Sequence, residues 1–473
     1  MTSLSPGTGA AVPAGGAASA AFLGPLLALF ICASSYAYGI LTVPRPFYST
    51  VTLGFLAALL AVFLVNLARI LRADESALGG ELRRVLLCAG ALHCALILGF
   101  YLSGHPQTAL WVEDSYHLHI PGAVNVAAYI HGREALGSIG VPFGGVFLTQ
   151  ALVGVFFSFL GASPVVSAAV LALVKLLAVV VLFRLGRMMF GERAGLIGAL
   201  LYVFSPTILY YTTVFYKEAV IQLVVAALLL AALRIYRKAG GWGDWLLLAA
   251  SLAALINERF YLFFFFLLAL IPPALHAARS LGRFSRAGAA LLAAACFSAL
   301  AYKYMGWVNA KFGPLNSSEG CFFSGINNLR ALYNGFPDVS SVNSTLAYPF
   351  AFLKILFTPF FTMNKFQLFS DYSYILIWGS FFNQAVIALS LYGLYKALRA
   401  DWRTHGLLLF PYFLFLCIFA YVAPFNGRLR DSFYPLITIY AAYSVSKLYS
   451  VLSSRRGRCA TSRPPALKPL RPF

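Results

Sequence analysis

Charged side chains are scarce in this chain of 473 residues, where Asp, Glu, Lys and Arg together make up only 11%. Soluble globular domains carry about 25% of such residues. Hydrophobic residues account for 60% of the sequence, and its mean hydropathy is +0.80. No polar stretch holds enough apolar residues to fold around a core of its own. The composition therefore excludes a soluble enzyme and predicts one integral membrane domain with an elaborated loop.

Sequence motifs of nucleotide and zinc chemistry are also missing. The chain has no GxxxxGK[ST], GxGxxG or HExxH pattern, so nucleotide binding and zincin chemistry have no support. Its seven cysteines show no CxxC spacing, which argues against a zinc site and a disulfide framework. The net charge of +20 would suggest nucleic acid in a soluble protein. Its placement here indicates membrane lipids as the partner, and no nucleic acid.

Apolar runs of about 20 residues are long enough to cross the hydrocarbon core of a bilayer. The positive-inside rule places both termini and 23 of the 35 basic residues on the cytoplasmic side, with nine of the 15 acidic residues outside. This assignment requires the apolar run Pro142–Leu160 to lie at the interface without crossing. The sequence thus predicts an all-α polytopic membrane protein with about 12 transmembrane helices and interfacial helices in the first large external loop. The spans begin near Ala21, Thr50, Val85, Val165, Ala194, Ala219, Trp245, Tyr261, Ala287, Tyr374, Gly406 and Phe433.

Six segments follow from this topology. They are a disordered N-terminus (1–20), two additional transmembrane helices (21–84), a transmembrane core (85–302) with the external loop 103–164, an external loop with an interfacial helix (303–371), C-terminal transmembrane helices (372–452) and a basic cytosolic tail (453–473). The first 20 residues contain no basic side chain, so the run that follows them is expected to be an uncleaved span.

The strongest local signal lies in the external loop 103–164. Glu113 and Asp114 are adjacent carboxylates, and Tyr116, His117 and His119 follow them closely. A carboxylate at the outer membrane surface can act as general base toward an acceptor hydroxyl. The same groups, with His117 and His119 as ligands, can hold a divalent cation that neutralises a phosphate. The alternative is a polar loop end whose charges face water. No cofactor is required by the sequence; a divalent metal is the one candidate.

Two very short external turns also carry charge. Lys217 and Glu218 lie in the first, where Glu218 is a candidate second carboxylate and Lys217 a candidate phosphate contact. A charged residue at the end of a span raises the free energy of membrane insertion, so such residues often have a function. Interfacial snorkelling with a local ion pair is equally compatible with this turn. Glu258 and Arg259 lie in the second turn, where the alternatives are substrate binding and an ion pair that closes a helical hairpin.

Arg428 and Arg430 lie outside, before the last span, against the general charge bias. Guanidinium groups match phosphate oxygens bidentately, which predicts phosphate binding here, with lipid headgroup contact as the alternative. Lys175 lies near the middle of a predicted span, where a lysine normally needs a cavity or a carboxylate partner. The sequence does not name that partner.

The order of these features resembles a known family over roughly residues 85–290. An acidic pair and Tyr-His stand at the start of the loop. They are followed by an apolar helix and the turn Gly161–Pro164. Next come the cytosolic linker RLGRMMFGERAG, a span ending LYVFSPTILYY and the turn with Glu218. The chain is similar to the GT-C superfamily of polytopic glycosyltransferases. It resembles in particular the family-39-like bacterial members related to protein O-mannosyltransferases and the lipid A aminoarabinose transferase.

The resemblance implies transfer of a sugar from a polyprenyl-phosphate carrier to an acceptor hydroxyl at the outer leaflet of a bacterial inner membrane, with inversion. It implies Asp114 as the catalytic carboxylate, Glu113 as its alternate and Glu218 as the later acidic residue. Lys217, Arg428 and Arg430 would then contact the lipid phosphate. The acceptor, whether glycan, lipid or protein, is left open.

Two other functions remain compatible with the sequence. A transporter or flippase would place charges along a path through the membrane and show repeat symmetry. Apart from Lys175 the charges lie at the membrane surfaces, and no internal repeat is evident. A polymerase or ligase of lipid-linked glycans would share the donor class and differ in moving a whole glycan.

Overall fold

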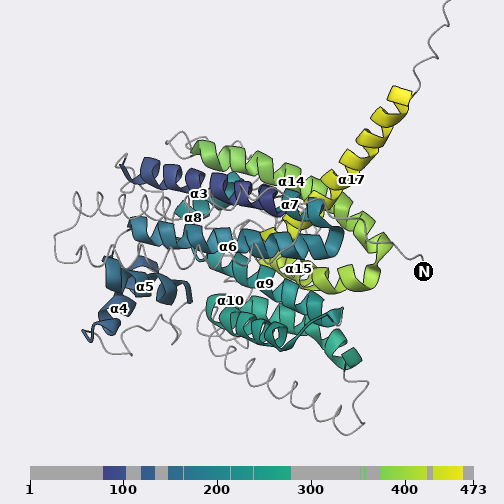
Figure 1. Ribbon diagram of the computed structural model, residues 1–473. Helices are drawn as coiled ribbons and strands as arrows, with labels where there is room; N and C mark the ends of the chain where they lie inside the picture. Colours follow the sequence, from purple (N-terminus) through teal and green to yellow (C-terminus); the bar gives the residue numbers. More distant parts are fainter. Residues whose placement is uncertain are drawn as a thin grey trace, which may run out of the picture.

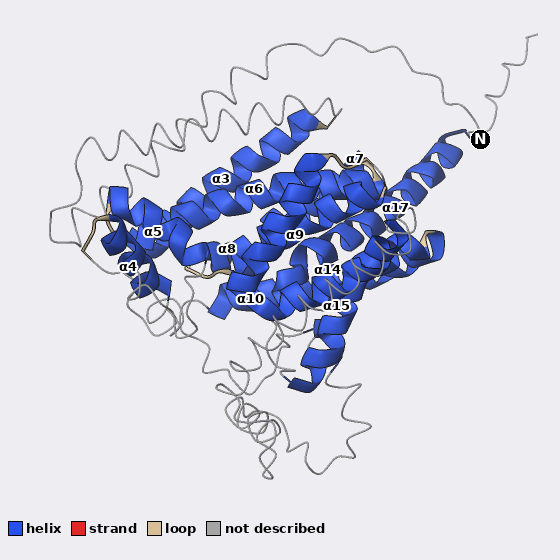
Figure 2. Cartoon of the chain, turned by 90° about the horizontal axis from the view of Figure 1, so that it is seen from below, coloured by secondary structure: helices blue, strands red, loops and turns tan. Residues whose placement is uncertain are grey.

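The structure is a computed structural model in which the described part of the chain is a bundle of helices without a strand (Figures 1 and 2). The described residues are 78–102, 119–133, 148–162, 164–213, 215–237, 239–277, 352, 356–357, 373–422 and 430–461. The helices are α3 (Gly79–Leu102), α4 (Ile120–Ile130), α5 (Leu148–Leu160), α6 (Pro164–Phe190), α7 (Glu192–Val203), α8 (Pro206–Thr213), α9 (Glu218–Tyr236), α10 (Trp242–Ala277), α14 (Ser373–Ala400), α15 (Trp402–Val422) and α17 (Tyr434–Thr461), with the 3₁₀ turn η7 (Asp431–Phe433).

Helices α6 and α9 form the centre of the bundle. They contain the two stretches of the described chain that are long and apolar enough to cross a membrane, Val166–Phe190 and Glu218–Tyr236. Helix α9 is buried around almost its whole circumference, which is the behaviour of a helix that is hydrophobic on every face. The all-helical fold is confirmed for the described residues, while the count of twelve spans stays a prediction.

Helices α6 and α7 form a close-packed hairpin at the predicted cytosolic linker. Gly191 adopts a positive φ of 93°, which glycine tolerates without strain, and it separates two otherwise helical segments. A Cβ atom on Gly195 would lie 2.6 Å from the carbonyl oxygen of Phe183, and one on Gly186 would lie 2.7 Å from the Cα of Gly195. Glycine is therefore needed at both positions for the two helices to touch.

We expect Gly195→Ala to lower the free energy of unfolding by about 1–3 kcal/mol, because the added methyl group overpacks a backbone contact. The control is Gly80→Ala on α3, where a Cβ would meet nothing within 4 Å. Alanine is the better helix former, so this control should be neutral or stabilising. Thermal unfolding of the purified variants in detergent measures both effects. Equal melting temperatures for the two variants would contradict the predicted close contact.

The short helices α4 and α5 pack together at one end of the bundle (Figure 1). Helix α5 has 13 residues, or about 20 Å, which is shorter than the ~30 Å hydrocarbon core. Residues 142–147 lie outside the described part of the chain, so the interfacial placement of Pro142–Leu160 stays a prediction. Gly161, with a φ of 85°, ends α5, and Pro164 then begins α6, as expected for the turn in the sequence.

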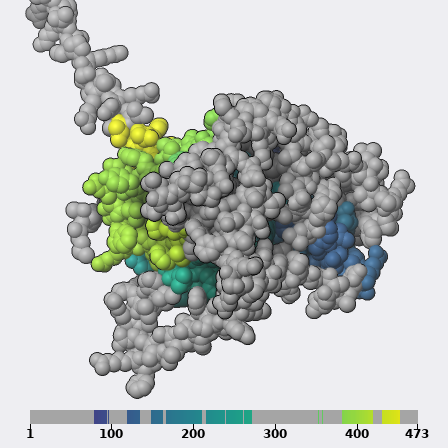
Figure 3. All heavy atoms as spheres, turned by 180° about the vertical axis from the view of Figure 1, so that it is seen from behind, coloured from purple at the N-terminus to yellow at the C-terminus, as the bar shows by residue number. Residues whose placement is uncertain are grey.

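Helix α17 packs against α7 and α14 and then extends beyond the bundle (Figure 1). Its helical structure continues to Thr461, inside the predicted basic tail. The view from behind shows the green and yellow atoms of α14, α15 and α17 on one side and the blue atoms of α4 and α5 on the other (Figure 3). Helix α5 therefore lies at the end of the molecule opposite to the extension of α17.

Candidate functional site

A buried ion pair joins the start of α9 to the middle of α10. Glu218 is the first residue of α9, where a negative charge is favoured by the helix dipole. Its Oε1 atom lies 2.5 Å from Nη2 of Arg259, and both side chains are buried. Arg259 has non-helical backbone angles (φ −151°, ψ 85°), so α10 is kinked at the position where the sequence predicts a turn. The acidic residue of one predicted turn thus pairs with the basic residue of another.

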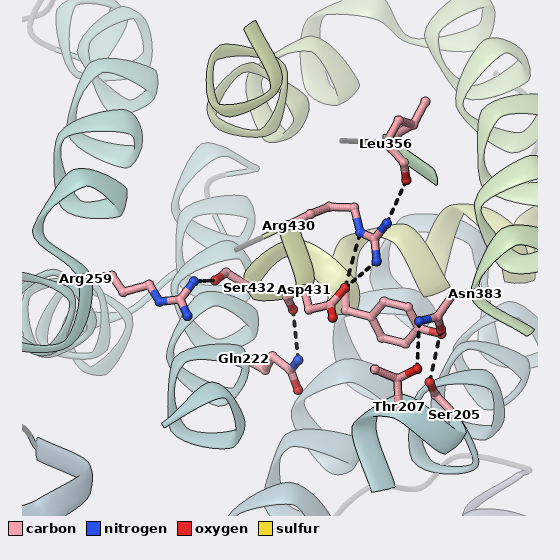
Figure 4. Close-up of polar contacts among 10 residues, drawn as sticks. Ser205, Thr207, Gln222, Arg259, Leu356, Asn383, Arg430, Asp431 and Ser432 are labelled. Atoms are coloured by element: carbon pink, nitrogen blue, oxygen red, sulfur yellow. Dashed lines mark hydrogen bonds and ion pairs between the residues drawn. The ribbon is translucent and has the colours of Figure 1, made fainter. Parts of the chain in front are cut away.

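A second buried ion pair lies at η7. Arg430 donates to Oδ1 of Asp431 from Nη2 at 2.7 Å and from Nε at 3.2 Å, and from Nη1 to the carbonyl oxygen of Leu356 at 2.8 Å. Ser432 accepts a hydrogen bond of 2.9 Å from Nη1 of Arg259. Figure 4 shows Arg259 extending to Ser432 from another helix, while Arg430, the residue directly before η7, contacts Asp431. The two ion pairs therefore form one cluster around Asp431–Ser432.

Glu258 connects this cluster to α5. Its Oε1 atom accepts hydrogen bonds from the backbone N–H of Thr149 at 2.5 Å and from Thr149 Oγ1 at 2.8 Å. Lys217, which is half-buried, donates from Nζ to the carbonyl oxygen of Glu258 at 3.2 Å. Residues 217–218, 258–259 and 430–432 from three predicted external turns are thus brought together.

Burial raises the pKa of the Glu258 carboxyl, opposed by the positive charge of Lys217 and the hydrogen bonds from Thr149. Burial also raises the pKa of the Asp431 carboxyl, opposed by the charge and hydrogen bonds of Arg430. Both carboxyls lie in connections between predicted spans. The positive neighbours keep carboxylates tolerable at a buried site where water solvates them poorly.

Polar residues on the predicted membrane helices form hydrogen bonds beneath the cluster, and one of them bonds directly to Asp431. Gln222 donates to the carbonyl oxygen of Asp431 at 2.8 Å and accepts a hydrogen bond of 2.8 Å from the hydroxyl of Tyr202. Asn383 contacts Tyr434 at 2.7 Å, Thr207 at 3.0 Å and Ser205 at 3.3 Å (Figure 4). Sequence reasoning missed these residues. The available signal was an amide side chain inside an otherwise apolar span, which is rare and is usually turned toward other protein groups.

The structure brings five of the predicted site residues together: Lys217, Glu218, Glu258, Arg259 and Arg430. Arg259 and Arg430 direct their guanidinium groups at protein carboxylates, so phosphate contact by Arg430 stays a prediction without geometric support. Predicted residues outside the described part of the chain are Glu113, Asp114, Tyr116, His117 and Arg428.

His119 is the first described residue after the acidic pair. Its side chain is buried, and its ring centroid lies 5.6 Å from that of Phe215, two residues before Lys217. Among the described residues, no three His, Cys, Asp or Glu side chains form a group that could hold a metal ion. A metal bound by His117 and His119 therefore stays a prediction.

Lys175 is fully buried in α6, and its Nζ atom lies 5.9 Å from the ring centroid of Tyr202. This distance is at the outer limit of a cation–π contact with Tyr202 on α7. In the described part of the chain the Nζ atom has no hydrogen-bond partner, so the carboxylate considered from the sequence is not found there.

Residues 142–302 match the model of a protein family described as dolichyl-phosphate-mannose-protein mannosyltransferase. This match confirms the resemblance to that branch of the GT-C superfamily, and it covers α5 to α10 with Lys217, Glu218, Glu258 and Arg259. Comparison with curated proteins and with solved structures gave no match. The family implies a membrane glycosyltransferase of the GT-C type.

Proposed function

We propose that the protein transfers a sugar from a polyprenyl-phosphate carrier to an acceptor hydroxyl on the outer side of a bacterial inner membrane, with inversion at the anomeric carbon. One observation carries the proposal. Charged residues from three predicted external turns meet at one buried cluster, and this cluster is hydrogen-bonded to α5 of the loop 103–164 through Glu258 and Thr149. That loop contains Asp114, the proposed general base, and Glu113, its alternate.

The proximity of the loop to the cluster is supported at a second point. His119 packs against Phe215 next to the turn with Lys217. Asp114 is five positions before His119, a length of at most about 18 Å when fully extended. The start of α4 and the first turn of α5 therefore both contact the region of Lys217 and Glu258.

The proposed reaction needs a base and a site for the leaving phosphate. The Asp114 carboxylate takes the proton of the acceptor hydroxyl, the hydroxyl oxygen forms a bond to the anomeric carbon, and the bond from that carbon to the phosphate oxygen breaks. The electron pair of this bond leaves with the polyprenyl phosphate. The donor is already activated, so no nucleotide site is required. Positive charge near the leaving phosphate stabilises the developing charge.

Lys217 is the cation that the described cluster offers to a donor phosphate. Arg259 and Arg430 are buried and point at carboxylates, whereas the Lys217 side chain is only half-buried and is therefore partly accessible to a ligand. Arg428 is the further candidate, from the turn before η7. Glu218 is held by Arg259 beside this position, which suits a role in orienting the site.

We expect Lys217→Gln to raise the KM for the lipid-phosphate donor about 10- to 100-fold, because a charge-assisted contact to the phosphate is lost. The measurement is the initial rate of transfer at several donor concentrations with protein reconstituted in liposomes. Lys447→Gln, an exposed lysine on the extension of α17, is the matched control and should leave the KM unchanged. An unchanged KM in Lys217→Gln would remove this residue from the donor site.

A deletion experiment separates the proposed function from its alternatives. Cells lacking the gene are complemented with the wild-type protein or with Asp114→Asn, and their envelope glycans, lipids and proteins are compared by mass spectrometry. Loss of a single sugar that only the wild type restores supports the transferase. Loss of a whole glycan supports a polymerase or ligase. Restoration by both proteins, with lipid-linked sugar retained on the inner leaflet in their absence, supports a transporter or flippase.

A further inference from the structure

Adjacent residues at the kink of α10 have separate partners. Arg259 pairs with Glu218 on α9 and donates to Ser432 in η7. Glu258 extends instead to the first turn of α5, where one carboxylate oxygen accepts both the N–H and the hydroxyl hydrogen of Thr149. The non-helical backbone at Arg259 therefore lies at the junction between the interfacial helices and the transmembrane core.

Thr149 is the second residue of α5. The first four N–H groups of a helix have no acceptor within that helix and need a partner from elsewhere. A carboxylate is a strong acceptor for such groups and interacts favourably with the helix dipole. In most helices the capping side chain precedes the helix in sequence, but here it comes from a residue 109 positions away.

We propose that Glu258 is a positioning residue that caps α5 from the core and thereby fixes α4 and α5 of the loop 103–164 against α10. The consequence for transfer rests on the proposed function, whereas the capping itself does not. Substrate binding, the role that the sequence suggested for Glu258, is the competing assignment.

The cap fixes more than one helix because α4 and α5 behave as a unit. A Cβ atom on Gly122 of α4 would lie 2.5 Å from the side chain of Gln150. One on Gly154 of α5 would lie 2.7 Å from the carbonyl oxygen of Ala123. Helices in such close contact cannot shift separately without steric overlap. Release of Thr149 from Glu258 therefore frees both helices of the loop from this attachment to α10.

The burial of the two partners makes the connection strong. Glu258 is 2% exposed and Thr149 is 0% exposed. Water cannot replace the lost acceptor at a buried helix end, so removing the carboxylate leaves the Thr149 groups unsatisfied. Lys217 donates to the backbone oxygen of Glu258, and this bond is kept when the side chain is replaced. The Glu258 charge also acts on Lys217, so Thr149→Val, which keeps that charge, separates the effect on α5 from the effect on Lys217.

Hydrogen–deuterium exchange and kinetics on the full-length protein in nanodiscs test the proposal. In Glu258→Ala, we expect the first-turn amides of α5 to exchange about 10-fold faster, with α9 unchanged. Thr149→Val loses the hydroxyl donor but keeps the backbone N–H donor, so a smaller increase is expected there. Thr149→Ser should restore wild-type exchange, since it keeps both donors. Ser158→Ala is the matched control, because that hydroxyl bonds within α5 to the carbonyl oxygen of Val155.

Kinetics with polyprenyl-phosphate-mannose, in membranes that contain the native acceptors, test the consequence. We expect kcat to fall about 10- to 100-fold in Thr149→Val, with little change in the donor KM, because a displaced base slows the chemical step. A raised donor KM in Glu258→Gln with unchanged exchange would overturn the proposal in favour of substrate binding. Faster exchange with unchanged kcat would also overturn it. A wild-type protein that transfers no sugar would contradict the proposed function, and the exchange data would still decide the cap.

Discussion

Replacing Asp114 with Asn is expected to reduce sugar transfer by about 1000-fold while the protein still inserts and folds. The amide cannot accept the proton of the acceptor hydroxyl, and general base catalysis contributes about 10²–10⁴ in rate. Asn has nearly the same shape as Asp, so contacts that depend on size are kept. The measurement is single-turnover transfer from a polyprenyl-phosphate sugar, compared with wild-type protein at equal amounts in liposomes.

Glu113→Gln is the matched control for this experiment. It removes the adjacent charge, so a smaller decrease in rate is expected. Gel filtration in detergent and resistance to protease establish that each variant is folded. Full activity of Asp114→Asn, together with loss of activity in Glu113→Gln, would exchange the roles of the two carboxylates. Full activity in both variants would remove the loop from the reaction and with it the proposed mechanism.

Arg430→Ala is expected to destabilise the folded protein by about 3–5 kcal/mol, because the variant leaves the buried Asp431 carboxylate without its counter-charge. Both side chains of this pair are within 1% of complete burial. The truncation also removes the donor to the carbonyl oxygen of Leu356 and creates a cavity. We therefore expect a strongly lowered melting temperature in detergent and a small yield of monodisperse protein.

Arg84→Ala provides the comparison, since Arg84 also pairs with a nearby carboxylate, that of Glu81. The Arg84 side chain is 77% exposed, and exposed pairs contribute about 0–1 kcal/mol. Little change in melting temperature is expected for this variant. If Arg430→Ala were as stable as Arg84→Ala but had a strongly raised donor KM, Arg430 would be a phosphate ligand, as the sequence suggested, and the structural role would be wrong.

Several features of the fold could be predicted from the sequence because they follow from local chemistry. Val165 and Ala219 were predicted to begin spans, and the two helices long and apolar enough to cross a membrane begin at Val166 and Glu218. The turn Gly161–Pro164 separates two helices as expected, because glycine accepts a positive φ and proline begins a helix without losing a hydrogen bond. The helical content of the cytosolic linker and the break between α7 and α8 were not foreseen.

The candidate site could be predicted one residue at a time but not as pairs. The sequence suggested a local ion pair within each of two turns, one in the turn with Lys217 and Glu218 and one in the turn with Glu258 and Arg259. Instead, Glu218 pairs with Arg259, and Glu258 bonds to Thr149. Thr149 lies in an apolar helix with nothing in its neighbourhood to mark it as a partner of a carboxylate. The amide-bearing residues Gln222 and Asn383 were overlooked for a related reason, since their partners are on other helices.

The sequence by itself indicated that the chain belongs in a membrane, and it predicted that nine of the 15 acidic residues lie in connections on one side. These properties depend on the free energy of transferring each side chain from water to lipid, and these free energies add nearly independently along the chain. Only the tertiary structure decided which acid meets which base, and that one of them holds a helix of the loop in place. Ion pairs and hydrogen bonds change strength over one or two ångströms, and separations on that scale are set by helix packing rather than by residue spacing.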